Sequence, residues 1–96
     1  MQNLLSFGQL RIDARLACFR EKAKSGRDPS TPDETLNYLL YTVRTLCPAR
    51  ILEIGTGEGL SGAAMLFAAE NARLTSIECD EERFLTAKKN FADLGL

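Results

Sequence analysis

The hydrophobic positions in the first half of the chain predict two amphipathic helices. Over residues 9–24, apolar side chains recur on one helical face, and a segment of turn-forming residues ends that helix. A second helix has Thr31 as its N-cap, Pro32 at the first helical position, Glu34 completing a capping box, and Pro48 as its stop. The stripe of the first helix is Leu10, Ala14, Ala17 and Cys18, widened by Ile12, Leu16 and Phe19; that of the second is Leu36, Leu39, Leu40, Val43 and Cys47.

The second half alternates short apolar runs with helical patterns. Residues 50–54 and 73–78 are mostly apolar and bounded by turn formers, which is typical of buried parallel strands. Residues 60–70 predict a helix that is apolar nearly all round, and a last helix begins with the acidic residues 80–82 and ends near Gly95. The order helix–helix–strand–helix–strand–helix predicts an α/β fold. It matches the N-terminal part of a Rossmann-like, doubly wound parallel sheet, preceded by a helical cap.

Length and charge limit the organisation of the chain. Its 96 residues allow one domain. We expect residues 1–30 to be an N-terminal helical segment and residues 31–96 to form the strand–helix–strand part. The net charge is −1, so the whole molecule is not built to coat nucleic acid or membrane, but residues 1–30 carry +3. That basic segment could contact a polyanion, although such a pattern is more commonly the solvent-exposed face of a helix.

The cysteines and the terminal segments narrow the class of protein. Cys18, Cys47 and Cys79 are far apart, and the chain has no histidine, which argues against a zinc site. An odd, sparse set of cysteines also argues against a disulfide framework and fits a reducing cytosol. We see no signal peptide, and the longest apolar run is too short to span a membrane. We therefore expect a cytoplasmic protein without a membrane partner.

Residues 51–62, Ile-Leu-Glu-Ile-Gly-Thr-Gly-Glu-Gly-Leu-Ser-Gly, contain two overlapping glycine patterns. Counted from Gly55 the pattern is E-x-G-x-G-x-G, beginning at Glu53; counted from Gly57 it is the dinucleotide fingerprint G-x-G-x-x-G. Either count places a glycine loop before a helix N-terminus, with Glu78 at the next strand tip, where it can accept hydrogen bonds from ribose hydroxyls. A carboxylate at position 53 favours the first count, because it suits a cationic ligand and repels a pyrophosphate. The second count would also put a glycine in the strand end.

On these residues, the segment 29–96 resembles the N-terminal half of the class I S-adenosylmethionine-dependent methyltransferases. Residues 51–61 resemble the first motif of that superfamily and residues 74–82 the second. The Gly-x-Ser ending, the S-I-E-x-D-E-E-R strand end and the P-x-x-P-x-E-T helix start are most similar to the O-methyltransferase group. That group includes catechol and caffeoyl-CoA methyltransferases and the bacterial tRNA hydroxyuridine methyltransferases. Its members often have a bulky aromatic residue at the position of Leu60, where this chain departs from the pattern.

The resemblance implies S-adenosylmethionine as the cofactor and a role for each matching residue. Thr31, Ser61 and Cys79 each have a simpler alternative: a plain N-cap, the cap of the following helix, and a buried small apolar group, respectively. The implied roles are for Glu53 to orient the methionine moiety, Gly55, Gly57 and Gly59 to line the loop, Ser61 to bond the amino-acid end, Glu78 to hold the ribose hydroxyls, Cys79 to lie near the adenine, and Thr31 to approach the cofactor through its backbone.

The resemblance also implies parts that this sequence does not supply. The family uses a divalent metal such as Mg²⁺, but we find no candidate metal ligands or catalytic residues here. The methyl acceptor would be a hydroxyl of a tRNA wobble uridine or of a small phenol, and the basic N-terminal segment favours RNA.

Two strands alone leave sheet edges and apolar faces uncovered. We therefore expect a truncated methyltransferase, inactive by itself and prone to homo-oligomerise through its exposed sheet edge. The alternatives are an NAD-dependent oxidoreductase fragment using the second glycine count and a non-catalytic cofactor-binding module.

Overall fold

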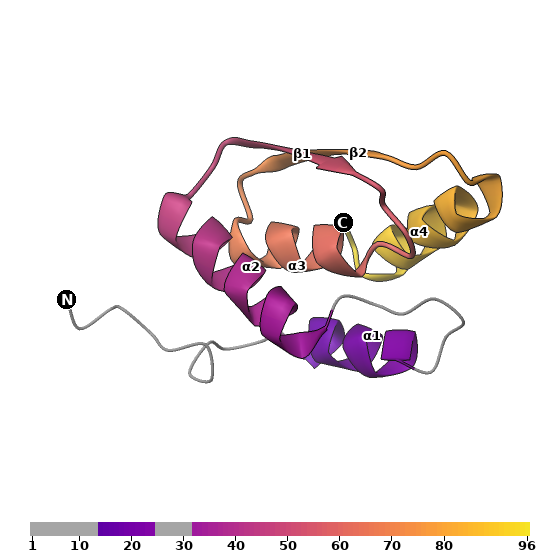
Figure 1. Cartoon of the computed structure of the whole chain (residues 1–96), viewed down its shortest axis with the longest axis horizontal. Coiled ribbons are helices and arrows are strands. Elements are labelled where there is room, and N and C mark those ends of the chain that lie inside the picture. The colour runs from indigo at the N-terminus through magenta and orange to yellow at the C-terminus, as the bar shows by residue number, and fades with distance from the viewer. Residues whose placement is uncertain (1–13, 25–31) are drawn as a thin grey trace.

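The fold is that of a computed structural model, which describes residues 14–24 and 32–96. Within this part of the chain, helices and strands follow one another in the order expected from the sequence (Figure 1). They are α1 (Ala14–Lys24), α2 (Asp33–Leu46), β1 (Arg50–Ile54), α3 (Leu60–Ala68), β2 (Arg73–Ile77) and α4 (Glu81–Asp93). The α/β class is thus confirmed. No helix among the described residues has the length and apolar character needed to cross a membrane.

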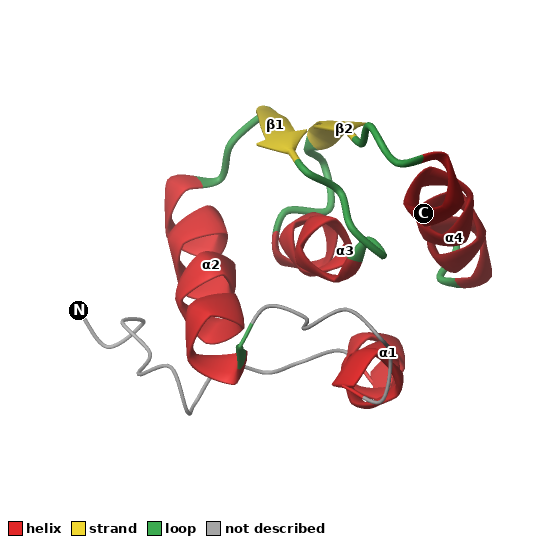
Figure 2. Ribbon diagram, turned by 45° about the vertical axis from the view of Figure 1, so that its right-hand side comes forward, coloured by secondary structure: helices red, strands yellow, loops and turns green. Residues whose placement is uncertain are grey.

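β1 and β2 pair in parallel, and α3 connects them. The register places Glu53 opposite Ser76 and Ile54 opposite Ile77. Exposure alternates along both strands, because successive side chains of a strand point to opposite faces of the sheet. One face packs on the helices, which lie on the same side of the sheet (Figures 1 and 2). The other face is open and leaves Leu52, Ile54 and Ile77 exposed at 67%, 73% and 52%.

The hydrophobic core lies where α1, α2 and the end of α4 pack around α3 (Figure 2). Ala63 and Ala64 of α3 are completely buried, and their small side chains let the neighbouring helices approach closely. Fully burying a large apolar side chain contributes about 1.5–3 kcal/mol, so the large side chains of this cluster stabilise the packing of the helices. Its buried members are Leu16, Phe19, Leu36, Leu40, Leu60, Ala63, Ala64 and Leu94.

Two cysteines expected in buried stripes are exposed, which corrects the sequence interpretation. In α1, Cys18 faces solvent, and Leu16 and Phe19 are buried instead. The helix turns these larger side chains toward α3, since they remove more apolar surface from water. Cys47 follows the end of α2 in the left-handed conformation, with φ of 47°, and its N–H donates to the Val43 carbonyl at 2.9 Å. The chain leaves the helix there, so the Cys47 side chain does not continue the buried stripe.

The helix boundaries differ from expectation by one or two residues. α2 begins at Asp33, and Pro32 precedes it with an extended ψ of 150°, so Pro32 is not the first helical residue. Pro32, the N-cap residue in the structure, makes no side-chain hydrogen bond to the helix end, and the expected cap Thr31 lies outside the described residues. α3 ends at Ala68 rather than at residue 70. β2 ends at Ile77, which places Glu78 directly beyond the strand, in the loop that leads to α4.

Candidate functional site

The glycine loop begins where β1 ends, at the carboxyl edge of the sheet. Gly55, Gly57 and Gly59 have φ values of 88°, 57° and 98°, a region that favours glycine because a Cβ atom crowds the backbone there. The N–H of Gly55 donates to the Ile77 carbonyl at 2.7 Å, and that of Gly59 donates to the Thr56 carbonyl at 3.1 Å. β1 ends at Ile54, directly before Gly55, as the pattern counted from Gly55 predicts, and the turn of the loop lies at Gly57 and Glu58.

The glycines of this loop face different surroundings. A Cβ atom built on Gly55 or Gly57 would meet nothing within 4 Å, so the backbone there borders open space. A Cβ on Gly59 would lie 3.0 Å from the Phe91 ring, and one on Gly62 would lie 2.9 Å from Leu74. The first two glycines therefore leave room for a ligand, whereas Gly59 and Gly62 allow α3 to pack closely on α4 and β2.

Glu78 holds the tip of the glycine loop. Its Oε1 accepts a hydrogen bond from the Gly57 N–H at 2.8 Å, and its Oε2 accepts one from the Asp80 N–H at 3.0 Å. The bonds from Asp80 and Gly57 lower the pKa of this carboxyl, because both favour its charged form. A carboxylate has about four lone-pair positions, so each oxygen can accept a further hydrogen bond from a ligand hydroxyl.

Glu53 is the acceptor at the centre of a cluster of hydroxyl groups beneath the loop. Ser61 Oγ donates to Glu53 Oε2 at 2.5 Å, and Ser76 Oγ donates to Glu53 Oε1 at 2.6 Å. Thr56 Oγ1 lies 2.5 Å from Ser76 Oγ, and Thr56 is 8% exposed. We refer to Thr56, Ser76, Glu53 and Ser61 as the hydroxyl cluster.

Sequence reasoning missed Thr56 and Ser76. The signal was the strand alternation: Ser76 lies two positions before Glu78 and pairs in register with Glu53, so both side chains share a face of the sheet. The interpretation of Ser61 as the cap of its helix is wrong. The N-cap of α3 is Gly59, without a side-chain hydrogen bond, and the Ser61 hydroxyl is directed to Glu53 instead.

The comparisons with known proteins agree with this architecture. No protein-family model matches the chain, and no curated protein sequence matches it. Among solved structures, a candidate caffeoyl-CoA O-methyltransferase from Staphylococcus aureus is 27% identical with a TM-score of 0.79, over 88% of this chain and 40% of that one. A methyltransferase from Podospora anserina, bound to S-adenosylhomocysteine, is 23% identical with a TM-score of 0.80, over 88% of this chain and 38% of that one. The O-methyltransferase TomG from Streptomyces achromogenes, in complex with S-adenosylmethionine, is 24% identical with a TM-score of 0.70, over 91% of this chain and 40% of that one.

The chain has the fold of the N-terminal part of an O-methyltransferase. It spans about two fifths of the length of these solved structures. In this methyltransferase fold, the glycine loop and Glu78 lie at the carboxyl ends of two parallel strands, the edge where open α/β sheets bind their ligands.

The structure gives less information on the other predicted site residues, Cys79 and Thr31, and on metal ligands. Cys79 is exposed, with its Sγ 4.0 Å from Glu78 Oε2, so its interpretation as a buried apolar group is wrong. Thr31 is outside the described residues, and its predicted backbone contact is untested. Among residues 14–24 and 32–96, no group of three or more His, Cys, Asp and Glu side chains is placed to hold a metal ion.

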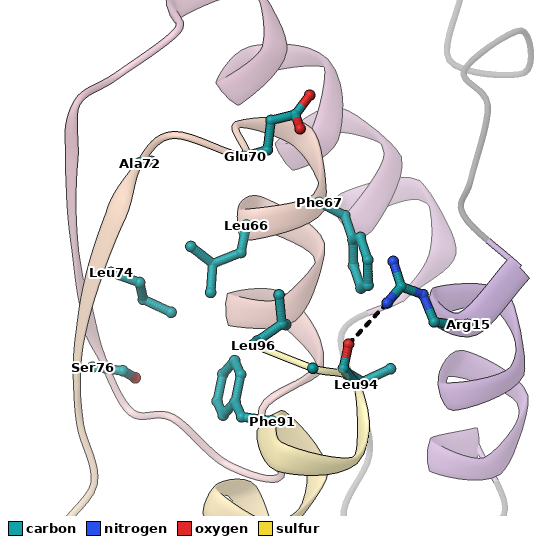
Figure 3. Close-up of a pocket in the computed structure, with 11 residues that line it drawn as sticks. Arg15, Leu66, Phe67, Glu70, Ala72, Leu74, Ser76, Phe91, Leu94 and Leu96 are labelled. Carbon is teal, nitrogen blue, oxygen red and sulfur yellow. Dashed lines mark hydrogen bonds between the residues drawn. The ribbon is translucent and has the colours of Figure 1, made fainter.

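A cavity of about 800 Å³ lies away from this edge, between β2, α3, α4 and the side chain of Arg15 (Figure 3). Arg15 closes one side, where its Nη1 donates to the Leu94 carbonyl at 3.0 Å and its guanidinium lies 4.8 Å from the centre of the Phe67 ring. Ser76 lines the cavity, but the glycine loop and Glu78 do not. The candidate cofactor site is therefore the loop edge and not this cavity.

Proposed function

We propose that this chain is the cofactor-binding part of an S-adenosylmethionine-dependent O-methyltransferase. The observation that carries the proposal is the meeting of three features at one sheet edge. These are the open backbone of Gly55 and Gly57, the anionic Glu78, and Glu53 beneath the loop. An edge with two carboxylates suits a ligand with an ammonium and a sulfonium group and disfavours a pyrophosphate, because like charges repel.

The residues present fit the cofactor, because the surface above the first two loop glycines is empty and the outer lone pairs of Glu78 remain available. Glu78 would accept the ribose hydroxyls, and Gly55 and Gly57 would border the cofactor through their backbone. Glu53 would orient the methionine moiety together with Ser61, whose hydroxyl donates to the Glu53 carboxylate. The exposed Cys79 would lie near the adenine. When bound, S-adenosylmethionine supplies an electrophilic methyl group.

The acceptor that we propose is a hydroxyl oxygen, on a tRNA wobble uridine or a small phenol. The basic composition of residues 1–30 supports RNA, since Lys and Arg side chains bind the phosphate backbone. A divalent metal would lower the pKa of the acceptor hydroxyl in such a reaction. Its ligands would come from outside the described residues.

Calorimetric titration of the protein with S-adenosylhomocysteine and, separately, with NAD⁺ tests this proposal. We expect heat of binding with S-adenosylhomocysteine and none with NAD⁺. Binding of NAD⁺ alone would replace the proposal with an oxidoreductase. Binding of S-adenosylhomocysteine without methyl transfer to any tested hydroxyl acceptor would leave a non-catalytic cofactor-binding module.

The open sheet face adds a proposal about association. Leu52, Ile54 and Ile77 form a row of exposed apolar side chains on strands whose outer edges are unpaired within the described chain. Exposed strand edges and apolar surfaces favour contact with another polypeptide. We propose that the isolated chain associates with a second copy of itself through this face, as a homo-oligomer.

A further inference from the structure

The hydroxyl cluster contains two side chains, Thr56 and Ser76, for which the proposed function has no role. We infer that Thr56 and Ser76 are positioning residues, which hold Glu53 in the orientation that selects ligands carrying the amino-acid end of the cofactor. This inference rests on the proposed function and extends it to specificity. Neither hydroxyl touches the cofactor; each acts through the Glu53 carboxylate.

The direction of the hydrogen bonds follows from counting protons. An ionised carboxylate only accepts, so the Ser76 hydroxyl uses its single proton on Glu53 Oε1. The Thr56–Ser76 contact at 2.5 Å can then form only if Thr56 donates. The cluster is therefore a directed chain from Thr56 to Ser76 to Glu53, with Ser61 donating to the other carboxylate oxygen. Hydrogen bonds that end on a charged group are shorter and stronger than neutral ones.

The cluster joins four segments of the chain, and Ser76 lies 20 and 23 residues from Thr56 and Glu53 in the sequence. Glu53 belongs to β1, Ser76 to β2, Ser61 to α3, and Thr56 to the glycine loop itself. Thr56 is fixed on both sides, because its N–H donates to the Ile77 carbonyl at 3.3 Å and its carbonyl accepts from the Gly59 N–H at 3.1 Å. Removal of the Ser76 hydroxyl would leave Ser61 as the donor to Glu53, and removal of the Thr56 hydroxyl would leave the Ser76 hydroxyl without its own donor. In both cases the backbone hydrogen bonds to the Ile77 carbonyl still hold the loop on β2.

The position of Glu53 explains why its orientation should matter for ligand specificity. Glu78 lies at the tip of β2, whereas Glu53 lies beneath the loop, bonded to the first turn of α3. The two carboxylates therefore serve different parts of a nucleoside ligand. Glu78 is placed for the ribose, and Glu53 for a group that lies over the helix N-terminus. A disturbance at Ser76 should weaken ligands with an amino-acid end and spare ligands without one.

The test compares two ligands by calorimetry, S-adenosylhomocysteine and 5′-methylthioadenosine, which lacks the amino-acid end. We expect Ser76→Ala to weaken S-adenosylhomocysteine about tenfold, as for loss of a hydrogen bond to a charged group, with 5′-methylthioadenosine unchanged. Ser76→Thr should restore binding, and Thr56→Val should weaken it where Thr56→Ser does not. Thr75→Ala is the matched control. Thr75 is next to Ser76 in β2, but its side chain lies on the opposite, open face of the sheet.

Two outcomes would overturn the inference. Equal weakening of both ligands by Ser76→Ala would assign the hydroxyl a general structural role, and no weakening would remove its role altogether. Introducing Ser76→Ala into a Glu53→Gln background should cause no additional loss, since residues that act through one another are not additive. An additive loss would contradict action through Glu53.

A measurement without ligand separates this inference from the proposed function. In nuclear magnetic resonance spectra of the wild-type protein, the hydroxyl protons of Thr56 and Ser76 should exchange slowly with solvent, and Ser76→Ala should abolish both slow signals. Rapidly exchanging hydroxyl protons would contradict the directed chain. Failure of the wild-type protein to bind either nucleoside would instead refute the proposed function, whatever the hydroxyl signals show.

Discussion

The carboxylate of Glu78 and the backbone N–H of Gly57 are joined by a 2.8 Å hydrogen bond across the carboxyl edge of the sheet. This bond ties the end of β2 to the tip of the glycine loop that follows β1. The residue proposed to read the ribose is thus also the residue that sets the position of the loop. In the proposed site, ligand binding and loop geometry would therefore depend on the same side chain.

Replacing Glu78 should reduce nucleoside binding. We expect Glu78→Gln to weaken S-adenosylhomocysteine by at least about tenfold, because charged acceptors form the stronger hydrogen bonds and the loop loses its anchor. Calorimetric titration measures the change. Glu82→Gln, an exposed position in the first turn of α4, is the matched control. Full affinity in Glu78→Gln would remove this residue from the site.

The lowered pKa of Glu78 predicts a pH dependence of stability. A carboxyl whose folded pKa lies below its unfolded value, about 4.3, stabilises the fold above that value. The contribution disappears as the pH falls through the lowered folded pKa. Thermal unfolding midpoints of wild type and Glu78→Gln should therefore differ at neutral pH, begin to approach each other as the pH falls below the unfolded pKa, and converge only below the lowered folded pKa. A difference that persists unchanged in acid would show that another group is responsible.

Substitutions at two loop glycines should have separable effects. Both Gly57→Ala and Gly59→Ala place a Cβ at positive φ, which costs about 1–2 kcal/mol. Gly59→Ala should lose more, because its Cβ would also press on the Phe91 ring at 3.0 Å. Urea unfolding measures both. Adding Phe91→Leu should recover part of the stability lost in Gly59→Ala and none of that lost in Gly57→Ala. Equal losses of stability in the two glycine variants, without such recovery, would contradict the packing role of Gly59.

The buried apolar side chains of α1 predict that this helix stabilises the whole fold. Leu16 is 1% exposed within the core cluster, so Leu16→Ala should destabilise the protein by about 2–5 kcal/mol. Cys18→Ala on the exposed side of the same helix should change stability by less than about 0.5 kcal/mol. Chemical denaturation of both variants makes the comparison. Similar small effects would mean that α1 contributes little to the core.

A charge on the open sheet face should reduce association of the isolated chain. Leu52 is 67% exposed at the centre of this face, so Leu52→Lys should lower the sedimentation coefficient of a self-associating sample without unfolding it. Leu85→Lys, at an exposed leucine of α4, is the control. A wild-type protein that stays monomeric at high concentration would refute the proposed association.

Local sequence features were sufficient to predict the order of the helices and strands and the end of β1 directly before the glycine loop. The bounds of β1 agree with the structure because Pro48 and Gly55 limit the apolar run on both sides. The same kind of pattern extended the second strand to Glu78, whereas the structure ends β2 one residue earlier, at Ile77. Such features depend on residues close together in the chain, so periodicity and turn chemistry are enough to find them.

Features that depend on contacts between distant segments needed the tertiary structure. Periodicity identified an apolar face on α1, but only docking on α3 decided that Leu16 and Phe19, and not Cys18, would be buried. The role of Ser76 requires the register that places it opposite Glu53, and register is a property of two strands that no single segment encodes. The sequence by itself therefore determined which residues could form a nucleoside site. The parallel pairing of β1 and β2 decided which of them meet, because it brings segments more than twenty residues apart to within hydrogen-bond distance.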